Sequence, residues 1–496
     1  MKPVVDIVCS LKNYSMLDVK CDRGIAAELS DYFSFLVPGY RFMPAFKNKV
    51  WDGKIRLFNS MTNELNAGLA VYLIAFCVQN SYEIDLEESE YGIPGVQDRI
   101  DTDDFNELLE SINLPFMPRE YQYNAVVDGL NKHNGIFLSP TGSGKSFIIY
   151  LWIAYYLSRI ADKEKILIVV PTTSLVEQLY SDFVDYGFDA ERAVHRIYSG
   201  KDKVTKKRII ISTWQSIYKF PKKWFEQFGM VVGDECHGFK SKSLSSIMNK
   251  ATEAKYRFGT TGTLDGTQTH KLVLEGLFGP VNQVTKTKNL QDDGTLAALD
   301  ITMLMLSYKE ETRQAQDGNS YQQEIDFIIN HEKRNKFIRN LALSQKGNSL
   351  ILFQRVKDHG KPLFELIRDK AAEGRKVFYV SGEVDTESRE AIRRIVESQS
   401  DAIIVASLGT FSTGINIRNL HNIVFASPSK SQIKVLQSIG RGLRQSDDGS
   451  TTKLFDIADD LHWKRKKNFT LLHSAERVKI YAKEQFKYKI VQVDIE

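Results

Sequence analysis

The chain has 496 residues, of which 42% are hydrophobic and 26% charged, and its formal net charge is +4 at pH 7. The length predicts about three domains, and the hydrophobic share can fill several buried cores. A charge this close to neutral permits nucleic-acid binding but does not argue for it.

Cysteine usage and apolar runs exclude further classes of protein. The four cysteines (Cys9, Cys21, Cys77 and Cys236) have no C-x-x-C spacing, which argues against a zinc site and a disulfide framework. The longest apolar run, residues 69–78, is too short to span a bilayer, and the first residues lack the pattern of a signal peptide. We therefore expect a soluble cytoplasmic protein without a membrane partner.

Residues 1–84 predict a small α+β domain. Residues 4–9 and 16–21 have the pattern of two strands, and Ile25, Leu29, Tyr32 and Phe33 form a helical stripe. A segment rich in aromatic and basic residues follows, with Tyr40, Arg41, Phe42, Phe46, Lys47, Lys49, Trp51, Lys54 and Arg56. Such a mixture suits stacking on bases and pairing with phosphates. It equally suits an ordinary domain in which the aromatics pack a core and the lysines cover its solvated face.

An acidic stretch then separates this domain from the rest. Residues 85–118 contain many carboxylates and are punctuated by Gly92, Pro94 and Gly95. This composition indicates a connector, and one unlikely by its charge to touch a nucleic-acid backbone.

A phosphate-binding loop is the strongest local signal. Ser139-Pro140-Thr141-Gly142-Ser143-Gly144-Lys145-Ser146 lies between an apolar strand at 135–138 and an apolar helix at 147–157. The glycines let backbone N–H groups turn towards a phosphate, Lys145 would reach the β- and γ-phosphates, and Ser146 would hold Mg²⁺. Ser139 stands where the pattern G-x-x-x-x-G-K-[ST] has its first glycine. The loop alone leaves kinase, transporter motor, GTPase and helicase open.

The strands around this loop end in polar residues. Apolar strands at 166–170, 209–211, 230–232 and 256–258 each precede a polar group, which suits a parallel sheet with ligands at its carboxyl edge. The polar groups are Pro171-Thr172-Thr173, Ser212-Thr213-Trp214-Gln215, Asp234-Glu235-Cys236-His237 and Gly259-Thr260-Thr261-Gly262-Thr263.

In this order the motifs resemble those of superfamily 2 helicases of the DEAH-like branch, with Asp234-Glu235-Cys236-His237 as the acidic box. The second half continues the series with Leu350-Ile351-Leu352-Phe353-Gln354 (motif IV), Ile403-Ile404-Val405-Ala406-Ser407 and Thr413-Gly414-Ile415-Asn416 (motif V), and Gln437-Ser438-Ile439-Gly440-Arg441-Gly442-Leu443-Arg444 (motif VI). The resemblance implies an α/β fold of two tandem RecA-like lobes, parallel sheets with flanking helices, preceded by the small α+β N-terminal domain.

The resemblance also implies a role for each candidate residue in ATP hydrolysis. Asp234 and Ser146 would hold Mg²⁺, and Glu235 would orient or deprotonate the attacking water. Arg441 and Arg444 would act as arginine fingers on the γ-phosphate. Arg119 and Gln122 would recognise adenine, and Gly414 and Asn416 would approach the ribose and phosphates. The other loop residues that would bind the phosphates are Thr141, Gly142, Ser143 and Gly144.

Two further sets have implied roles. His237, with Gln437 as its expected partner, and Thr261 and Thr263 would couple ATP to the movement of the lobes. The candidates for the nucleic-acid backbone are Pro171, Thr172, Thr173, Thr213, Trp214, Gln215, Ser407 and Thr410. A threonine at a strand end is also a common helix cap.

A closer resemblance, covering nearly the whole chain, is to the recombination helicases of bacteriophages. It is carried by Asp31-Tyr32-Phe33-Ser34-Phe35, Trp51-Asp52-Gly53 and Ser381-Gly382-Glu383-Val384-Asp385-Thr386. It implies a monomeric enzyme of the infected bacterial host that uses ATP and Mg²⁺ to remodel branched DNA and RNA–DNA hybrids, with single-stranded, duplex and branched DNA as partners. Two alternatives stay open: a duplex translocase that does not separate strands, and a strand-annealing protein with a vestigial ATPase.

The domain prediction is completed by lobes at 119–280 and 281–460 and a basic helical extension at 461–496. Lys464-Arg465-Lys466-Lys467 opens this extension, and Leu471, Leu472, Ala475, Val478 and Tyr481 give it a helical stripe. Such a basic cluster is more often a solvated face than a phosphate site.

Overall fold

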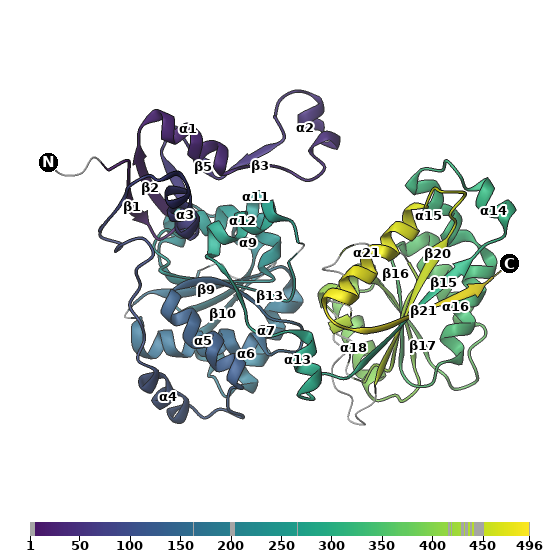
Figure 1. The fold of residues 1–496 in the computed structure, drawn as a ribbon. Helices are drawn as coiled ribbons and strands as arrows, with labels where there is room; N and C mark the ends of the chain where they lie inside the picture. The colour runs from purple at the N-terminus through teal and green to yellow at the C-terminus, as the bar shows by residue number, and fades with distance from the viewer. Residues whose placement is uncertain are drawn as a thin grey trace. The chain divides into compact units, whose positions relative to one another are not determined.

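The computed structural model describes residues 5–161, 163–198, 204–264, 266–414, 417, 419–427, 431, 435–436, 439–440 and 451–495 (Figure 1). The chain divides into two compact units, residues 1–139 with 144–284, and residues 140–143 with 285–496. Within the described ranges, no helix combines the length and the apolar character needed to cross a membrane.

The N-terminal domain is a small sheet with two main helices. Its sheet has the order β5-β6-β2-β1-β7, in which β1 pairs antiparallel with β2 and parallel with β7. The elements are β1 (Ile7–Asn13), β2 (Met16–Cys21), α1 (Arg23–Tyr32), β5 (Phe58–Asn59), β6 (Glu64–Asn66), η2 (Ala67–Leu69), α3 (Ala70–Asn80) and β7 (Ile84–Glu87). Asp22 caps α1 by accepting a hydrogen bond from Ile25 N at 2.8 Å. The predicted α+β domain is thus confirmed.

The aromatic and basic segment forms a finger, residues 34–56, which projects from this domain (Figure 1). Its base is the antiparallel pair β3 (Ser34–Leu36) and β4 (Lys54–Arg56), and its tip holds η1 (Tyr40–Phe42) and α2 (Pro44–Lys47). Gly53, at φ 84°, is required there because a Cβ would lie 2.4 Å from the Tyr40 ring. Phe42 and Val50 are 80% and 81% exposed. These side chains therefore do not fill a core.

The acidic stretch expected as a connector contains two ordered elements. Strand β7 belongs to the N-terminal sheet, and helix α4 (Thr102–Ser111) packs on the first lobe. Phe105, Leu108 and Leu109 of α4 are buried in the core of that lobe.

Seven parallel strands form the described sheet of the first lobe, in the order β10-β11-β9-β12-β13-β8-β14. They are β8 (Asn134–Leu138), β9 (Lys165–Val170), β10 (Val194–Ile197), β11 (Ile209–Thr213), β12 (Phe228–Asp234), β13 (Tyr256–Thr261) and β14 (Val281–Gln283). The helical segments are α5 (Glu120–Lys132), α6 (Lys145–Tyr155), η3 (Tyr156–Ile160), α7 (Thr173–Asp185), α8 (Ala190–Ala193), α9 (Trp214–Ile217), α10 (Lys222–Phe225), η4 (Cys236–Lys240), α11 (Lys242–Lys250) and α12 (Gln268–Phe278).

The second lobe repeats this architecture, with seven described parallel strands in the order β17-β18-β16-β19-β20-β15-β21. They are β15 (Leu299–Ser307), β16 (Ser349–Phe353), β17 (Val377–Val380), β18 (Ile403–Ser407), β19 (Asn422–Phe425), β20 (Thr452–Asp460) and β21 (Lys487–Asp494). The helical segments are α13 (Thr287–Asp292), α14 (Glu310–Ala315), α15 (Tyr321–Asn330), α16 (Glu332–Ser344), η5 (Val356–Gly360), α17 (Lys361–Arg368), α18 (Thr386–Glu397), α19 (Leu408–Gly414) and α21 (Phe469–Lys483).

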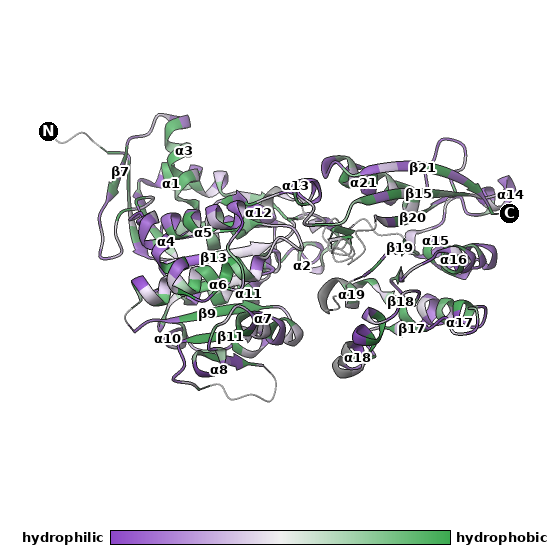
Figure 2. Cartoon of the chain, turned by 90° about the horizontal axis from the view of Figure 1, so that it is seen from below, coloured by the Kyte–Doolittle hydropathy of each residue, from purple (hydrophilic) through white to green (hydrophobic). Residues whose placement is uncertain are grey.

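Hydropathy explains these layers. Central strands such as β9, β11 and β18 are apolar along their length, whereas α16, α17 and α18 have a polar outer face (Figure 2). A parallel sheet covered on both faces requires such strands. The two RecA-like lobes implied by the helicase resemblance are confirmed.

The C-terminal extension at 461–496 was expected to be helical to near Tyr488, but α21 ends at Lys483. Strand β21 follows α21 and pairs parallel with β15 at the edge of the second sheet. Helix α21 is fixed to the same sheet, because Arg477 Nε and Tyr481 OH both donate to Asp456 Oδ2 at 2.8 Å. Residues 469–494 are therefore part of the second lobe.

The N-terminal domain packs directly on α11 and α12 of the first lobe. Ser15 Oγ donates to Met248 O at 3.1 Å, and Tyr72 OH donates to Glu275 Oε2 at 2.7 Å. Leu272 of α12 is buried in the N-terminal core. At Gly68 a Cβ would lie 2.0 Å from Glu275 O, so the two backbones are in contact there. This domain is docked on the first lobe over a close interface.

Candidate active site

The phosphate-binding loop connects β8 to α6, as the sequence predicts. Gly142 and Gly144 have φ angles of 85° and 79°, which favour glycine. At Gly144 a Cβ would also lie 2.4 Å from Gln122 Nε2. Ser139 is buried, has no positive φ and donates its N–H to Thr261 O at 2.9 Å. A glycine is therefore not required at the first position of the loop.

Lys145 and Ser146 are the first residues of α6. Lys145 Nζ donates to Ser139 O at 3.1 Å, and Ser146 Oγ lies 2.8 Å from Tyr186 OH. Ser143 Oγ donates to Pro140 O at 2.6 Å, which closes the turn. With the N-terminus of α6 behind it, this loop can bind an anionic phosphate.

The acidic box begins at the carboxyl end of β12. Asp234 accepts a hydrogen bond from Thr260 Oγ1 of the neighbouring strand β13 at 2.8 Å. Burial raises the pKa of Asp234, the Glu235 carboxylate raises it further, and the Lys145 ammonium acts in the opposite direction. A bound cation would favour the charged carboxylate in the same way as Lys145 does.

Glu235, His237, Thr261 and Thr263 form one polar network. Glu235 has a φ of 49°, so the chain turns sharply after β12. His237 Nδ1 lies 3.3 Å from Glu235 Oε2 and 3.0 Å from Thr261 Oγ1. Thr263 N donates to Thr261 Oγ1 at 3.4 Å, and Thr263 Oγ1 is buried without a hydrogen-bond partner among the described residues. The acidic box and the predicted coupling segment are therefore in direct contact.

The two residues predicted to recognise adenine begin α5. Gln122 is buried, and its Oε1 accepts the N–H of Arg119 at 2.9 Å. Gln122 and Gly144 are close neighbours, so α5 and the phosphate loop meet at this point. Phe116, half exposed, packs on Phe147 with ring centroids 4.8 Å apart. Sequence reasoning missed this aromatic, which lies three residues before Arg119.

The predicted nucleic-acid contacts of the first lobe lie at the ends of β9 and β11. Thr172 caps α7, accepting from Leu175 N at 3.4 Å, and Thr173 begins that helix. Thr213 precedes α9, which begins at Trp214. Gln215 Nε2 donates to Pro171 O at 3.3 Å. Since β9 and β11 are parallel neighbours, all six candidates lie at one edge of the sheet.

In the second lobe, Ser407 and Thr410 lie at the end of β18. Ser407 Oγ donates to Thr410 Oγ1 at 2.6 Å, and both residues are buried. Gly414 ends α19. Asn416, Gln437, Arg441 and Arg444 lie outside the described residues, so their roles stay predictions.

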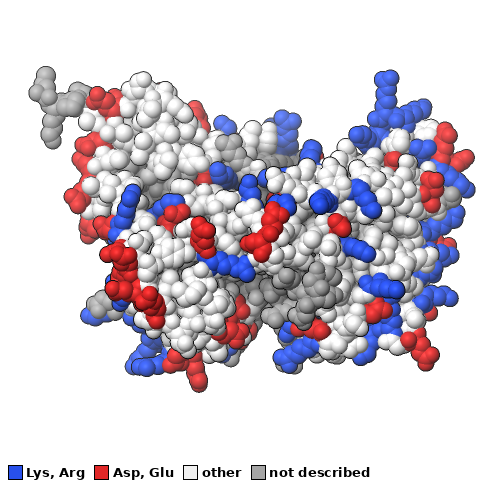
Figure 3. All heavy atoms as spheres, turned by 60° about the horizontal axis from the view of Figure 1, so that its bottom comes forward, with Lys and Arg blue, Asp and Glu red and all other residues white. Residues whose placement is uncertain are grey.

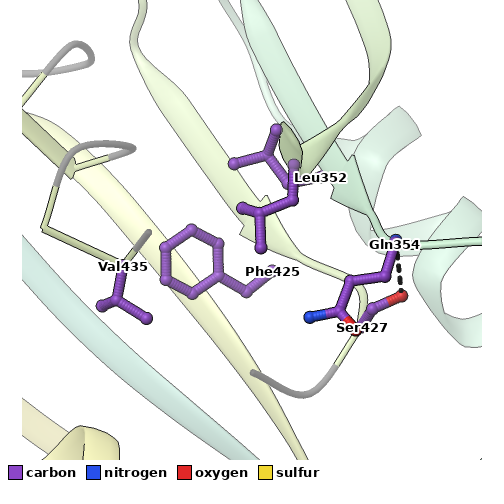
Figure 4. Close-up of a pocket in the computed structure, with 6 residues that line it drawn as sticks. Leu352, Gln354, Phe425, Ser427 and Val435 are labelled. Carbon is purple, nitrogen blue, oxygen red and sulfur yellow. Dashed lines mark hydrogen bonds between the residues drawn. The ribbon is translucent and has the colours of Figure 1, made fainter. Parts of the chain in front are cut away.

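A small cavity lies at the carboxyl ends of the central strands β16 and β19 (Figure 4). Its volume is about 10 Å³, room for roughly one water molecule. Its lining includes Leu352, Phe425 and Ser427, and Ser427 Oγ accepts from Gln354 N at 3.2 Å. A cavity of this size cannot hold a nucleotide.

The chemistry of the donors suits a hard cation. Asp234 and Ser146 offer oxygen atoms, which Mg²⁺ prefers, and Mg²⁺ usually takes few protein ligands together with phosphates and water. In the described part of the chain, no cluster of three or more His, Cys, Asp or Glu could hold a metal by itself.

Three sequence families match parts of the chain. Residues 6–87 match the family "DNA helicase UvsW, N-terminal". Residues 115–266 match "Type III restriction enzyme, res subunit", and residues 332–446 match "Helicase conserved C-terminal domain".

One relative is similar over the whole chain. The ATP-dependent DNA helicase uvsW of Enterobacteria phage T4 is 37% identical over 515 aligned positions, which cover 99% of this chain and 100% of that protein. The crystal structure of T4 UvsW matches with a TM-score of 0.53 and 34% identity, over 99% of this chain and 100% of that one. This chain belongs to the UvsW family of helicases.

As a UvsW-family protein, the chain is an ATP-dependent DNA helicase of superfamily 2, and the predicted enzyme class is confirmed. A more distant relative is the DNA 3'-5' translocase XPB2 of Sulfurisphaera tokodaii, 21% identical over 84% of this chain and 93% of that protein. Nucleotide use follows from the helicase class.

One contact at the predicted nucleotide site of this helicase could not be predicted from the sequence. Tyr186 lies directly after α7, 40 residues beyond Ser146, and its hydroxyl meets the hydroxyl of Ser146. No motif marks Tyr186, because only the packing of α7 against α6 brings it there.

Proposed function

We propose that this UvsW-family helicase uses ATP and Mg²⁺ to remodel branched DNA and RNA–DNA hybrids, by fork regression, junction migration and unwinding of R-loops. The proposal rests on one observation: the finger, residues 34–56, projects from the N-terminal domain with exposed aromatic and basic side chains. A motor that steps along one strand does not by itself prefer a branch, and the finger can hold a second arm of the DNA.

In the proposed nucleotide site, the loop from Thr141 to Ser146 holds the phosphates, and Arg119 and Gln122 recognise the base. Asp234 and Ser146 would hold Mg²⁺, which would neutralise charge on the nucleotide phosphates. Glu235 orients the attacking water. Gly414 and Asn416 bind the ribose and phosphates, and Arg441 and Arg444, with Gln437, complete the site when ATP closes the lobes.

The network around Glu235 supports coupling between hydrolysis and movement. Thr261 touches both Glu235 and His237, so a change at the γ-phosphate can reach residues 261–263 through two hydrogen bonds. The buried Thr263 hydroxyl lacks a partner among the described residues, and a buried polar group is expected to have one. We expect it to gain one in another state of the cycle.

The nucleic-acid track of the proposal runs over the carboxyl edges of the two sheets. Pro171, Thr172, Thr173, Thr213, Trp214 and Gln215 serve it in the first lobe, and Ser407 and Thr410 in the second. Hydroxyl and backbone N–H groups at strand ends suit contacts with phosphates that do not depend on sequence.

A labelled replication fork tests the proposal. The wild-type protein with ATP and Mg²⁺ should convert forks into regressed products and displace RNA from an R-loop, while the Glu235→Gln variant should bind the same substrates without product. ATP hydrolysis stimulated by DNA, with no product on forks, junctions or R-loops, would refute it.

A duplex translocase that does not separate strands is the second candidate, favoured by the similarity to XPB2. Displacement of a triplex-forming strand from plain duplex DNA, measured beside fork remodelling, separates the two candidates. Triplex displacement without strand separation would favour the translocase. Light scattering with and without DNA would test the expected monomer.

A further inference from the structure

The basic cluster of the C-terminal segment forms a tight turn, here called the basic turn, residues 463–467. Trp463 N donates to Lys466 O at 3.1 Å, and Lys466 N donates to Trp463 O at 3.0 Å. Lys464 has a φ of 51°, and its Nζ lies 5.8 Å from the Trp463 ring centroid. Lys464, Arg465, Lys466 and Lys467 are all exposed. Four cations thus stand at the tip of an ordered turn.

Buried polar groups anchor the turn at its end. Glu324 of α15 is 3% exposed and accepts the N–H groups of Phe469 and Thr470 at 2.9 and 2.7 Å. It also accepts Asn468 Nδ2 at 2.8 Å and Thr470 Oγ1 at 2.6 Å. These hydrogen bonds fix the start of α21, and with it the end of the turn, to α15.

The turn projects beyond the carboxyl edge of the second sheet. Strands β16, β18, β19 and β20 are parallel, and their registers place Ser407 level with Ile457. Strand β20 continues to Asp460, three residues further, or about 10 Å at the usual rise of a strand. The basic turn therefore stands above the edge that carries Ser407 and Thr410.

Exposed aromatics lie beside the turn. Tyr321 begins α15 and Phe469 begins α21, and the two helices lie side by side in Figure 1. Their rings meet edge to face with centroids 5.9 Å apart, yet they are 40% and 42% exposed. Aromatic rings and cations on one surface suit unpaired nucleic acid, since rings stack on bases and cations bind phosphates.

The charges around the basic turn also suit a nucleic-acid contact. Lys466 pairs with Asp317 at 3.4 Å. Among the described residues, no carboxylate lies within ion-pair distance of Lys464, Arg465 or Lys467. Figure 3 shows many Lys and Arg side chains on the part of the surface that belongs to the second lobe.

We propose that the basic turn and the Tyr321–Phe469 pair form a nucleic-acid contact of the second lobe. Lys464, Arg465 and Lys467 bind the sugar-phosphate backbone, and the aromatic pair stacks on an unpaired base next to the track. The proposal deepens the proposed function and rests on it only for the place of this contact in remodelling.

A charge variant with a matched control tests the phosphate contacts. Lys464→Ala, Arg465→Ala and Lys467→Ala together should weaken binding of a labelled single strand at least about 10-fold and reduce the slope of log Kd against log salt by about 2. The control combines Lys453→Ala, Lys487→Ala and Lys489→Ala, exposed lysines at the amino-terminal halves of β20 and β21. The control removes the same total charge and should leave both the single-strand affinity and the slope of log Kd against log salt unchanged.

A second variant tests the aromatic pair. Tyr321→Ala with Phe469→Ala should weaken single-strand and fork binding about 5- to 100-fold but leave blunt duplex binding unchanged. Melting temperature and ATP hydrolysis without DNA should stay at wild-type values in every variant.

Equal losses in the turn variant and the control would show a general charge effect and overturn the proposal, as would wild-type affinity in the turn variant. Loss of duplex and single-strand binding alike in the aromatic variant would overturn the stacking role. If the wild type binds single strands but does not remodel forks, the proposed function fails. The contact proposed here is still tested, because the variants are compared by their binding of single strands.

Discussion

At the scale of single residues, the predicted nucleotide site brings charged groups together, since, in addition to burial, the Glu235 carboxylate raises the pKa of Asp234 and the Lys145 ammonium lowers it. The Lys145→Ala variant should lower ATP turnover by about 10²–10³-fold, because it removes a cation from the developing phosphate charge. The Glu235→Gln variant should keep ATP binding and lose turnover, since an amide still fits but cannot activate water. Steady-state hydrolysis and nucleotide binding measure both.

A conservative change provides the control for these variants. Glu332→Gln alters an exposed carboxylate on α16, and turnover should stay at the wild-type level. Wild-type turnover by Glu235→Gln would remove Glu235 from its assigned role.

His359 makes the stability of the second lobe depend on pH. The ring is buried, its Nδ1 lies 3.1 Å from Ser427 Oγ, and its Nε2 has no partner among the described residues. Burial and the nearby Arg334 guanidinium lower the pKa of His359 to about 3. Below an unfolded-state pKa near 6.5 the unfolded chain binds the extra proton, so stability falls between pH 6.5 and 3, by up to about 1.4 kcal/mol per pH unit.

The His359→Asn variant should flatten this dependence. Melting temperatures of the wild type and variant at pH 7, 6 and 5 should converge as the pH falls. Burial lowers the pKa of His133 as well, to about 4, but His133 is present in both proteins and cancels in the comparison. A constant difference across the range would assign the pH dependence to other groups.

At the scale of elements, Glu324 joins α15 to the start of α21. The Glu324→Gln variant keeps the shape but replaces charge-assisted hydrogen bonds at a helix N-terminus, so we expect a loss of about 1–3 kcal/mol in the free energy of unfolding. Urea unfolding followed by a probe in the second lobe measures it. Glu332→Gln, on an exposed site, should change it by less than about 0.5 kcal/mol.

Strands and helices were predictable where the pattern was continuous. Runs that end in polar residues predicted β9, β11, β12 and β13, because buried parallel strands leave their chemistry at the carboxyl edge. The segments of β16 and β18 were marked only by their resemblance to helicase motifs IV and V. Strand β21 was missed, although Tyr488, Ile490, Val491 and Val493 are residue types that favour strands. Helix α21 ends without glycine or proline, at a turn where Gln485 has a φ of 59°, so no breaker residue marks the boundary between helix and strand.

The candidate site was predicted as a set of residues but not as a set of contacts. The loop pattern pointed to Lys145, and the resemblance to helicases pointed to Asp234 and Glu235. The hydrogen bonds of Tyr186 and Thr260 depend on how distant strands and helices pack, and these contacts leave no local pattern. The sequence left two interpretations of the finger open, a nucleic-acid contact or an aromatic core with a solvated lysine face. Only the fold shows which of its side chains are exposed.

At the scale of the molecule, the finger should control the choice of substrate. Lys47→Glu, Lys49→Glu and Lys54→Glu together should weaken fork and junction binding and flatten its salt dependence, because they remove phosphate contacts. ATP hydrolysis stimulated by a single strand should change little. The matched control replaces Lys453, Lys487 and Lys489 by Glu. If the control loses as much affinity for forks and junctions, the finger has only a structural role.

Charge reversal is a sharper test than removal of the N-terminal domain. Leu272 of α12 is buried in the N-terminal core, and Phe105 of α4 is buried in the first lobe. A truncation before residue 110 would expose both surfaces, and lost activity could then reflect misfolding.

The close contact at Gly68 predicts a strong effect of one methyl group. The Gly68→Ala variant places a Cβ within 2.0 Å of Glu275 O, so the N-terminal domain must shift from α12. We expect a lower melting temperature and easier proteolysis between residues 88 and 101. Val71→Ala, an exposed position on α3, is the control and should have neither effect.

The same contact offers a path for mechanical load, provided that the finger holds a DNA arm as proposed. Tension on the finger should then reach α12 where Gly68 meets Glu275 O and where Leu272 is buried in the N-terminal core. Helix α12 begins five residues after Thr263, next to the hydrogen bonds of Glu235. A pull on the arm should therefore alter the rate of ATP turnover, and optical-trap measurements on a tethered fork should show less force sensitivity in the Gly68→Ala variant than in the wild type.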